Sequence, residues 1–179
     1  MDLWTIRSNV KTCNKCPFFS AVPTQPQSGL GSAKAKVMLI TLRATLQAHQ
    51  YGKPIDERNE LLLKKLLDNT GISGNDIYVT SVVKCAGPVK PAKAFNANAQ
   101  TCISEHLAKE IEVIQPKFLV FFGVTSAKMA GFGEIVTDLP NADTTYITHS
   151  FEELYRHGVK YFNHAQGCLK EIGKCLTTT

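Results

Sequence analysis

The chain has 179 residues, of which 44% are hydrophobic and 20% charged, with six cysteines and a formal net charge of +5. This length and composition are typical of one globular domain, and we expect a single domain over residues 1–179. The sequence has neither an apolar run of about 18 residues nor a cleavable signal at its N-terminus, which predicts a cytoplasmic protein without a membrane span. The positive charge permits a polyanionic partner such as DNA but does not require one.

In chain order, the apolar pattern first predicts an amphipathic helix over residues 1–12 and a Pro- and Gly-rich loop over 18–32. A continuous apolar run at 36–40 predicts a strand that is buried on both faces. After an irregular stretch over 41–56, leucines at helical spacing predict a helix over 59–69. The first part of the chain therefore alternates helix and strand.

The rest of the chain continues this alternation. Further strands are expected over residues 76–83, 118–122 and 145–148, and further helices over 99–114, from Thr125 and over 165–176. Loops are expected over 86–98 and 131–144, and the pattern over 154–160 is ambiguous. Such alternation indicates crossover connections, and therefore a mostly parallel sheet with helices on both faces. We expect an α/β fold with three layers, α/β/α, around a central four-stranded sheet.

This architecture by itself indicates where a ligand binds. In open α/β sheets, ligands bind beyond the carboxyl ends of the strands. The segments expected to rim a cleft there are 41–56, 81–85, 123–126 and the chain from His149 onward.

Four of the cysteines have positions in the sequence that suit metal ligands. Cys13 and Cys16 form a close pair, whereas Cys85 follows a strand and Cys102 opens a helix. Thiolates suit zinc or an iron–sulfur cluster, and structural zinc sites usually draw two close pairs, so one pair with two single cysteines favours a cluster. The remaining two cysteines lie seven residues apart on one helix, where ordinary packing is expected.

Several motifs occur together and in a fixed order. They are Cys-x-x-Cys-Pro at 13–17, Gly-Lys-Pro at 52–54 ahead of three leucines, Asp-Ile-Tyr-Val-Thr-Ser-Val-Val-Lys-Cys at 76–85, Ala-Gln-Thr-Cys at 99–102, the run 111–123, and His149. In these motifs the chain resembles the family 4 uracil-DNA glycosylases, which carry a [4Fe-4S] cluster. The resemblance implies that a [4Fe-4S] cluster, with zinc as the alternative, is bound by Cys13, Cys16, Cys85 and Cys102. The cluster would tie the N-terminal arm, which carries the close pair, to the body of the protein.

The resemblance also implies which residues surround a flipped-out base. The family uses an acidic first motif, an aromatic platform, an asparagine that reads uracil, and a closing histidine. This chain has Leu42, Ile55 and Ser81 at the first three positions and keeps only His149. Leucine cannot position water, isoleucine offers no π-face, and serine cannot make a bidentate amide contact.

Uracil excision is therefore expected to be weak, lost or redirected. The predicted base pocket consists of Thr41, Leu42, Arg43, Ile55 and Ser81. The related family 5 enzymes also carry an apolar residue in the first motif and remain active, so Leu42 alone does not exclude catalysis. The predicted catalytic groups are His149 and, as a substitute base in the same loop as the first motif, His49.

Contacts with DNA are predicted at three positions near the cleft. Lys84 and Arg156 would meet phosphates, and Leu154 would enter the minor groove as an apolar wedge. The alternative for Leu154 is that it packs on the body of the protein as part of a helix face.

Three functions remain open from the sequence. The first is a DNA-binding iron–sulfur protein with an accessory role in DNA replication or repair and a protein partner there. The second is an active, divergent glycosylase that releases uracil or another deaminated or modified base. The third is a protein-interaction module without catalysis.

Overall fold

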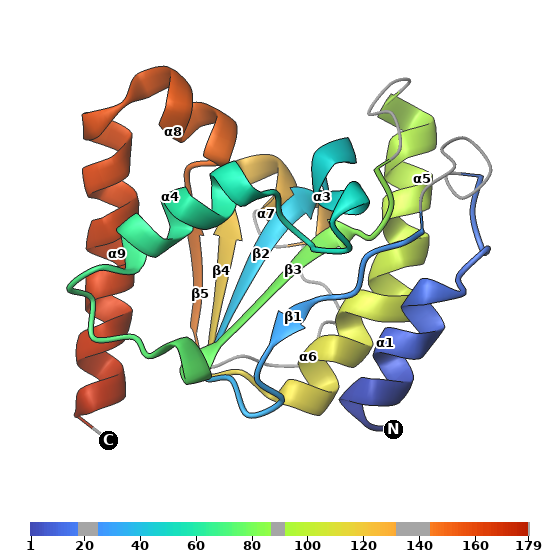
Figure 1. Ribbon diagram of the computed structural model, residues 1–179, viewed down its shortest axis with the longest axis horizontal. Helices are drawn as coiled ribbons and strands as arrows, with labels where there is room; N and C mark the ends of the chain where they lie inside the picture. Colours follow the sequence, from blue (N-terminus) through green and yellow to red (C-terminus); the bar gives the residue numbers. More distant parts are fainter. Residues whose placement is uncertain (18–24, 87–91, 132–143, 179) are drawn as a thin grey trace.

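The structure is a computed structural model that describes residues 1–17, 25–86, 92–131 and 144–178. Its sheet has the strand order β1-β3-β2-β4-β5 (Figure 1). Four parallel strands confirm the predicted ones: β2 (Val37–Arg43), β3 (Ile77–Val83), β4 (Phe118–Phe122) and β5 (Thr144–Thr148). The two-residue strand β1 (Leu30–Gly31) adds an antiparallel edge within a stretch that the sequence indicated as a loop.

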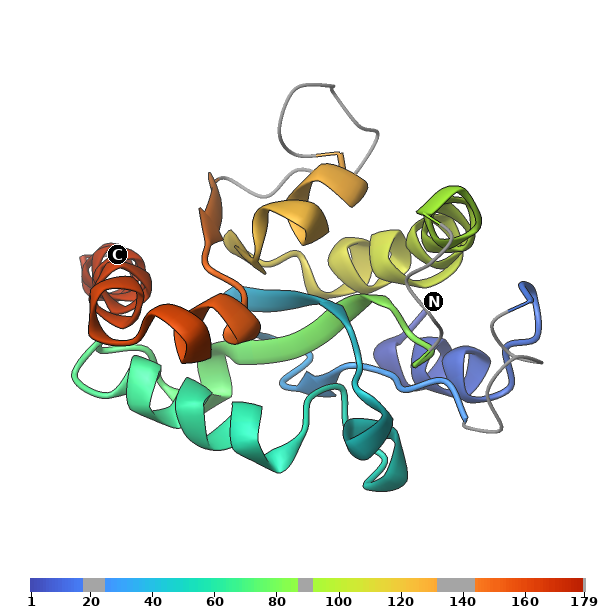
Figure 2. The ribbon, with the colours of Figure 1, turned by 90° about the horizontal axis from the view of Figure 1, so that it is seen from above.

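Helices cover both faces of this sheet, which confirms the three-layer α/β/α architecture (Figure 2). On one face lie α1 (Leu3–Lys11), α5 (Ala92–Cys102), the π-helical turn η2 (Ile103–Leu107), α6 (Ala108–Ile114) and α7 (Val124–Met129). On the other face lie α4 (Glu57–Leu67), α8 (Phe151–His157) and α9 (Val159–Thr177). The short helices α3 (Leu46–Gln50) and η1 (Gly74–Asp76) lie in connections. Among the described helices, none is long and apolar enough to span a membrane.

Three segments differ from the prediction. Helix α5 begins at Ala92, inside the stretch expected to be a loop, because Phe95, Ala99 and Cys102 recur at helical spacing and are buried among lysines and asparagines. Helix α3 forms within 41–56, where Thr45 caps its N-terminus. The ambiguous segment 154–160 begins within helix α8, which forms because Ser150 and Glu153 make a reciprocal capping box at its N-terminus. Parts of the predicted loops, at 18–24, 87–91 and 132–143, lie outside the described residues.

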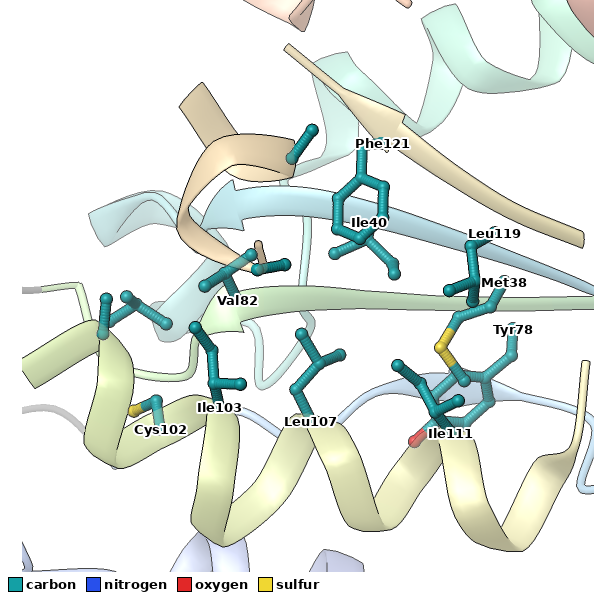
Figure 3. Packing of buried hydrophobic residues seen from close by; sticks show 14 of the residues in the cluster. Met38, Ile40, Tyr78, Val82, Cys102, Ile103, Leu107, Ile111, Leu119 and Phe121 are labelled. Atoms are coloured by element: carbon teal, nitrogen blue, oxygen red, sulfur yellow. The ribbon is translucent and has the colours of Figure 1, made fainter. Parts of the chain in front are cut away.

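The core divides between the two faces of the sheet, because side chains alternate along each strand. Met38 and Ile40 of β2 point towards α5 and α6, whereas Val37 and Leu39 point towards α4 and α9. Figure 3 shows the first face, where the helical row Cys102, Ile103, Leu107 and Ile111 packs onto the strands. Cys102 thus belongs to the core-facing side of its helix.

A buried ion pair crosses this first face. The Lys84 ammonium and the Glu110 carboxylate are 1% and 0% exposed, and Lys84 Nζ lies 2.6 Å from Glu110 Oε2. The same carboxylate accepts hydrogen bonds from the Tyr78 hydroxyl at 3.1 Å, the Thr80 hydroxyl at 2.8 Å and the Gly29 backbone N–H at 3.3 Å. It therefore joins α6 to β3 and to the segment that precedes β1.

His106 is buried on the same helical stretch, and neither ring nitrogen has a hydrogen-bond partner among the described residues. Desolvation, helped by the Lys84 ammonium, lowers the pKa of His106 to about 4 from its ordinary value of 6.5. The folded protein thus binds this proton less tightly than the unfolded chain does. The contribution of this histidine to the free energy of unfolding is therefore fully present above pH 6.5 and is lost as the pH falls towards 4.

We expect this histidine to contribute about 3 kcal/mol to the loss of stability between pH 7 and pH 4. His106→Leu removes a polar ring without partners from the core, so the variant should be at least as stable as wild type at pH 7 and less sensitive to acid. Urea unfolding at several pH values measures both effects. An unchanged pH dependence in the variant would contradict the assignment.

Candidate functional site

A cleft of about 560 Å³ opens at the carboxyl edge of the sheet. The chain runs from β2 to β3 on one side and places β4 on the other side of β2, so the strand order reverses between β2 and β4. Such a switch point leaves a crevice beyond the strand ends. Three of the four segments that the sequence predicted do line the cleft, from the loops after β2, β4 and β5. The fourth, 81–85, does not.

Gly123 shapes one wall, where β4 turns into α7. Its φ is 97°, and a Cβ atom at this position would lie 3.0 Å from Cβ of Ser150. A side chain here would be strained in the backbone and pressed against the start of α8. Glycine therefore lets the loops after β4 and β5 approach each other.

The predicted pocket residues Thr41, Leu42, Arg43 and Ile55 all line the cleft. Arg43 is half-buried and makes no salt bridge within the described part of the chain. Phe122 and Phe151 also line it and stack at 4.7 Å with an interplanar angle of 10°, but both rings are buried in the core. The half-buried lining at the end of β2 consists of Leu42 and Arg43, whereas Ile55 is as buried as the two phenylalanines, and the exposed ring of Tyr155 lines the cleft from α8.

Three carboxylates line the cleft, and the capping roles of two of them, Asp56 and Glu153, were not predicted from the sequence. Asp56 caps α4, and its oxygens accept bonds from the Asn59 N–H and the Thr45 hydroxyl, both at 2.9 Å. Glu153 Oε2 accepts from the Ser150 N–H at 2.8 Å and the Ser150 hydroxyl at 2.7 Å, and these bonds lower its pKa. The capping patterns Asp-x-x-Asn and Ser-x-x-Glu are visible in the sequence and were the available signal.

The two predicted catalytic histidines contact different parts of the protein. The His149 ring stacks on Tyr161 of α9 at 3.8 Å and lies 5.0 Å from the His164 ring, and burial and His164 lower its pKa. It is not among the residues that line the cleft, although Ser150 is. His49 is buried on α3, outside the lining, and desolvation lowers its pKa. The prediction of His49 as a general base is thus corrected, because its ring is enclosed in the protein.

Three further site predictions are corrected by burial. Lys84 is enclosed with Glu110 and therefore presents no charge to a phosphate. Ser81 is fully buried on β3, and its hydroxyl donates to the Val83 carbonyl at 2.9 Å. Leu154 is 4% exposed because it lies three residues after Phe151 on the inner face of α8. Arg156 is exposed and pairs with Glu152 at 2.6 Å, so a phosphate contact by Arg156 stays a prediction.

The predicted metal ligands Cys16, Cys85 and Cys102 lie at one end of the core. Cys85 follows β3, Cys102 ends α5, and both are buried beside Cys16. Burial and the thiols of Cys16 and Cys13 raise the pKa of Cys85 to about 12. A hydrogen bond with Cys16, followed by burial, raises the pKa of Cys102. The close pair Cys13 and Cys16 thus lies within electrostatic reach of Cys85, and Cys102 lies within reach of Cys16 and Cys85.

Within the described residues, no group of three or more Cys, His, Asp or Glu side chains is placed so that it could hold a metal ion. The donors themselves, four cysteine thiols, are of the kind that a [4Fe-4S] cluster or zinc takes. Metal bonds would replace the protons of Cys85 and Cys102, whose pKa values are raised in this environment.

Comparison with known proteins gives consistent matches. A profile of the uracil DNA glycosylase superfamily matches residues 28–169. The type-4 uracil-DNA glycosylase of Pyrobaculum aerophilum is 28% identical over 132 residues, covering 72% of this chain and 64% of the relative. Those of Thermotoga maritima and Sulfurisphaera tokodaii are each 27% identical, covering 68% and 71% of this chain and 62% and 57% of the relatives.

The matched segments span less than two thirds of these relatives. The profile nevertheless covers most of the chain, from before β1 into α9, and includes every segment that lines the cleft. This protein belongs to the uracil DNA glycosylase superfamily.

Proposed function

We propose that this protein binds DNA at the cleft and receives an extrahelical base there without efficient excision of uracil. Such a protein acts inside the cell as an accessory factor in DNA replication or repair, together with a protein partner. The observation that carries the proposal is the lining of the cleft, where Leu42 and Ile55 lie among the residues around an open volume of about 560 Å³. An aromatic ring fits a cavity of about 150 Å³, so this space is ample for a base. At the positions of the first motif and the platform, Leu42 cannot activate water and Ile55 cannot stack on a base.

We further infer that residues 1–179 form one domain whose N-terminal arm is held by a [4Fe-4S] cluster. The support is the gathering of Cys13, Cys16, Cys85 and Cys102 from three separate segments. When bound, the cluster supplies covalent ties between the arm, the end of β3 and the end of α5. Zinc in its place is the alternative that metal analysis of the purified protein decides.

One observation favours a second candidate function, a glycosylase for another deaminated or modified base. Glu153 places a carboxylate of lowered pKa in the cleft, one turn of helix after His149. An ionised carboxylate there can stabilise the positive charge that develops on a sugar as its base departs. This candidate requires release of a base other than uracil.

DNA binding at the cleft is tested most sharply through Arg43. We expect Arg43→Ala to weaken binding of a duplex with one abasic site about tenfold, or about 1.4 kcal/mol, because the cleft loses its half-buried cation. Lys170→Ala, which removes an exposed lysine from α9, is the matched control. Fluorescence anisotropy with a labelled duplex measures both affinities. Equal affinities for wild type and Arg43→Ala, or no binding at all, would contradict the proposal.

A further inference from the structure

Trp4 is 77% exposed, although tryptophan is the side chain with the most apolar surface to bury. Helix α1 turns Leu3, Ile6 and Val10 to the core, and this spacing leaves Trp4 on the outer side. The indole borders a groove of about 360 Å³ between α1 and the segment 28–30. The groove is separate from the cleft described above and from the cysteines.

The groove has a second apolar group and a backbone floor. Leu30 of β1 is 54% exposed beside it. Gly29, also in the lining, has no room for a side chain, because a Cβ atom would lie 2.3 Å from the Tyr78 ring. The floor therefore stays flat, and the indole face remains accessible.

The charged residues in the groove lining are both cations, and no acidic side chain is among the described residues that form it. Arg7 Nη2 donates to the Gly31 carbonyl at 3.0 Å, which fixes the guanidinium over the edge of the sheet. Lys11 lies one turn further along α1 and is exposed. The groove therefore favours an anionic ligand, with the positive charges in a row beside the indole.

An accessible aromatic face beside a row of cations is the arrangement that binds single-stranded nucleic acid, with bases stacked on the ring and phosphates on the cations. An acidic peptide would also suit the charges, but the accessible indole face adds a stacking surface that favours a base. Gly52 also lines the groove, and two and three residues further along the chain Pro54 and Ile55 line the cleft. The segment 52–55 therefore connects the lining of the groove with that of the cleft.

We propose that the groove between α1 and β1 binds single-stranded DNA that flanks the site in the cleft, with a base stacked on Trp4 and phosphates on Arg7 and Lys11. The proposal extends the proposed function, because the strand is the continuation of the DNA bound at the cleft. It assigns to the N-terminal helix a role in binding in addition to carrying the cysteine pair.

Trp4 is the only tryptophan of the chain, so its fluorescence reports on this groove directly. We expect an oligothymidylate of about ten nucleotides to quench this fluorescence and to do so less as salt rises. Trp4→Ala should weaken binding of the labelled oligonucleotide about tenfold, as expected for the loss of one stacked base. Lys11→Ala should weaken binding and reduce the slope of log affinity against log salt concentration by about one. Lys170→Ala should change neither quantity.

Unchanged fluorescence with the oligonucleotide, or equal affinity of Trp4→Ala and wild type, would overturn the proposal. Poly-glutamate at the same concentration of charges is the comparison ligand. If it quenches the fluorescence as much as DNA does, the proposal is overturned in favour of an acidic protein partner. Binding of the blunt abasic duplex separates the two proposals, because it depends on Arg43 in the cleft and not on Trp4. If the duplex binds and the oligonucleotide does not, only the groove assignment fails.

Discussion

Replacing Glu110 with glutamine is expected to lower the free energy of unfolding by about 3–5 kcal/mol, because the Lys84 ammonium would remain buried without its counter-charge. The carboxylate accepts four hydrogen bonds, from Lys84, Thr80, Tyr78 and the Gly29 backbone. A glutamine keeps one acceptor oxygen and turns an NH₂ group towards donors. Such a loss is a large fraction of the stability of an ordinary domain.

The effect should reach the cysteines as well as the core. Lys84 directly precedes Cys85, and its backbone contacts the Cys102 thiol. Gly29 belongs to the segment that follows the cysteine pair in the chain. Weakening the ion pair therefore loosens several of the elements that bring the thiols together.

Urea unfolding of Glu110→Gln and of the control Glu112→Gln, an exposed carboxylate on the same helix, measures this effect. The double variant Lys84→Met, Glu110→Gln should be less destabilised than the sum of the single variants, since it removes the unpaired charge. Equal stability of Glu110→Gln and Glu112→Gln would contradict the role of the buried pair.

Replacing Cys102 with serine is expected to abolish metal binding and to destabilise the N-terminal arm. Serine keeps the size of the side chain but replaces the soft thiolate with a hard hydroxyl. We expect an iron–sulfur cluster not to accept this hydroxyl as a ligand at neutral pH. In the proposed cluster, four metal bonds would link the N-terminal arm, the end of β3 and the end of α5, so their loss should act through folding. Cys85→Ser should behave in the same way.

Iron and sulfide content, absorbance near 400 nm and proteolysis of the N-terminal arm measure these effects. Cys175→Ser is the matched control, because Cys175 is exposed on α9, away from the buried cysteines. Brown protein that loses its colour in Cys102→Ser and keeps it in Cys175→Ser supports the cluster. Colourless wild-type protein with one bound zinc would refute the cluster and support the alternative.

The sheet was predictable because apolar runs at 36–40 and 118–122 and the β-branched stretch at 76–83 indicate strands without knowledge of their partners. The cleft followed from the alternation of strands and helices, so Leu42, Arg43 and Ile55 were placed correctly in its lining. Helix α5 was partly missed because Phe95 and Ala99 are separated by polar residues that conceal the buried face.

The errors at single residues share one cause, which is burial by partners distant in the sequence. Lys84 was expected at the surface, but the carboxylate that makes its burial possible lies 26 residues away on α6. Ser81 is likewise enclosed by distant elements, whereas the burial of Leu154 matches the alternative of a helix face that packs on the body of the protein. A lysine or a leucine next to a predicted cleft is therefore a weak indication of DNA contact.

The most direct test of the account is a single-turnover assay with excess protein on a duplex that contains one uracil, with wild type and His149→Ala compared. We predict that both proteins bind the duplex and that neither forms abasic sites above the background of the duplex alone. The same assay on duplexes with hypoxanthine, xanthine or hydroxymethyluracil tests the second candidate function. Rapid release of uracil by wild type that is abolished in His149→Ala would contradict the central claim that this cleft receives a base without efficient excision of uracil.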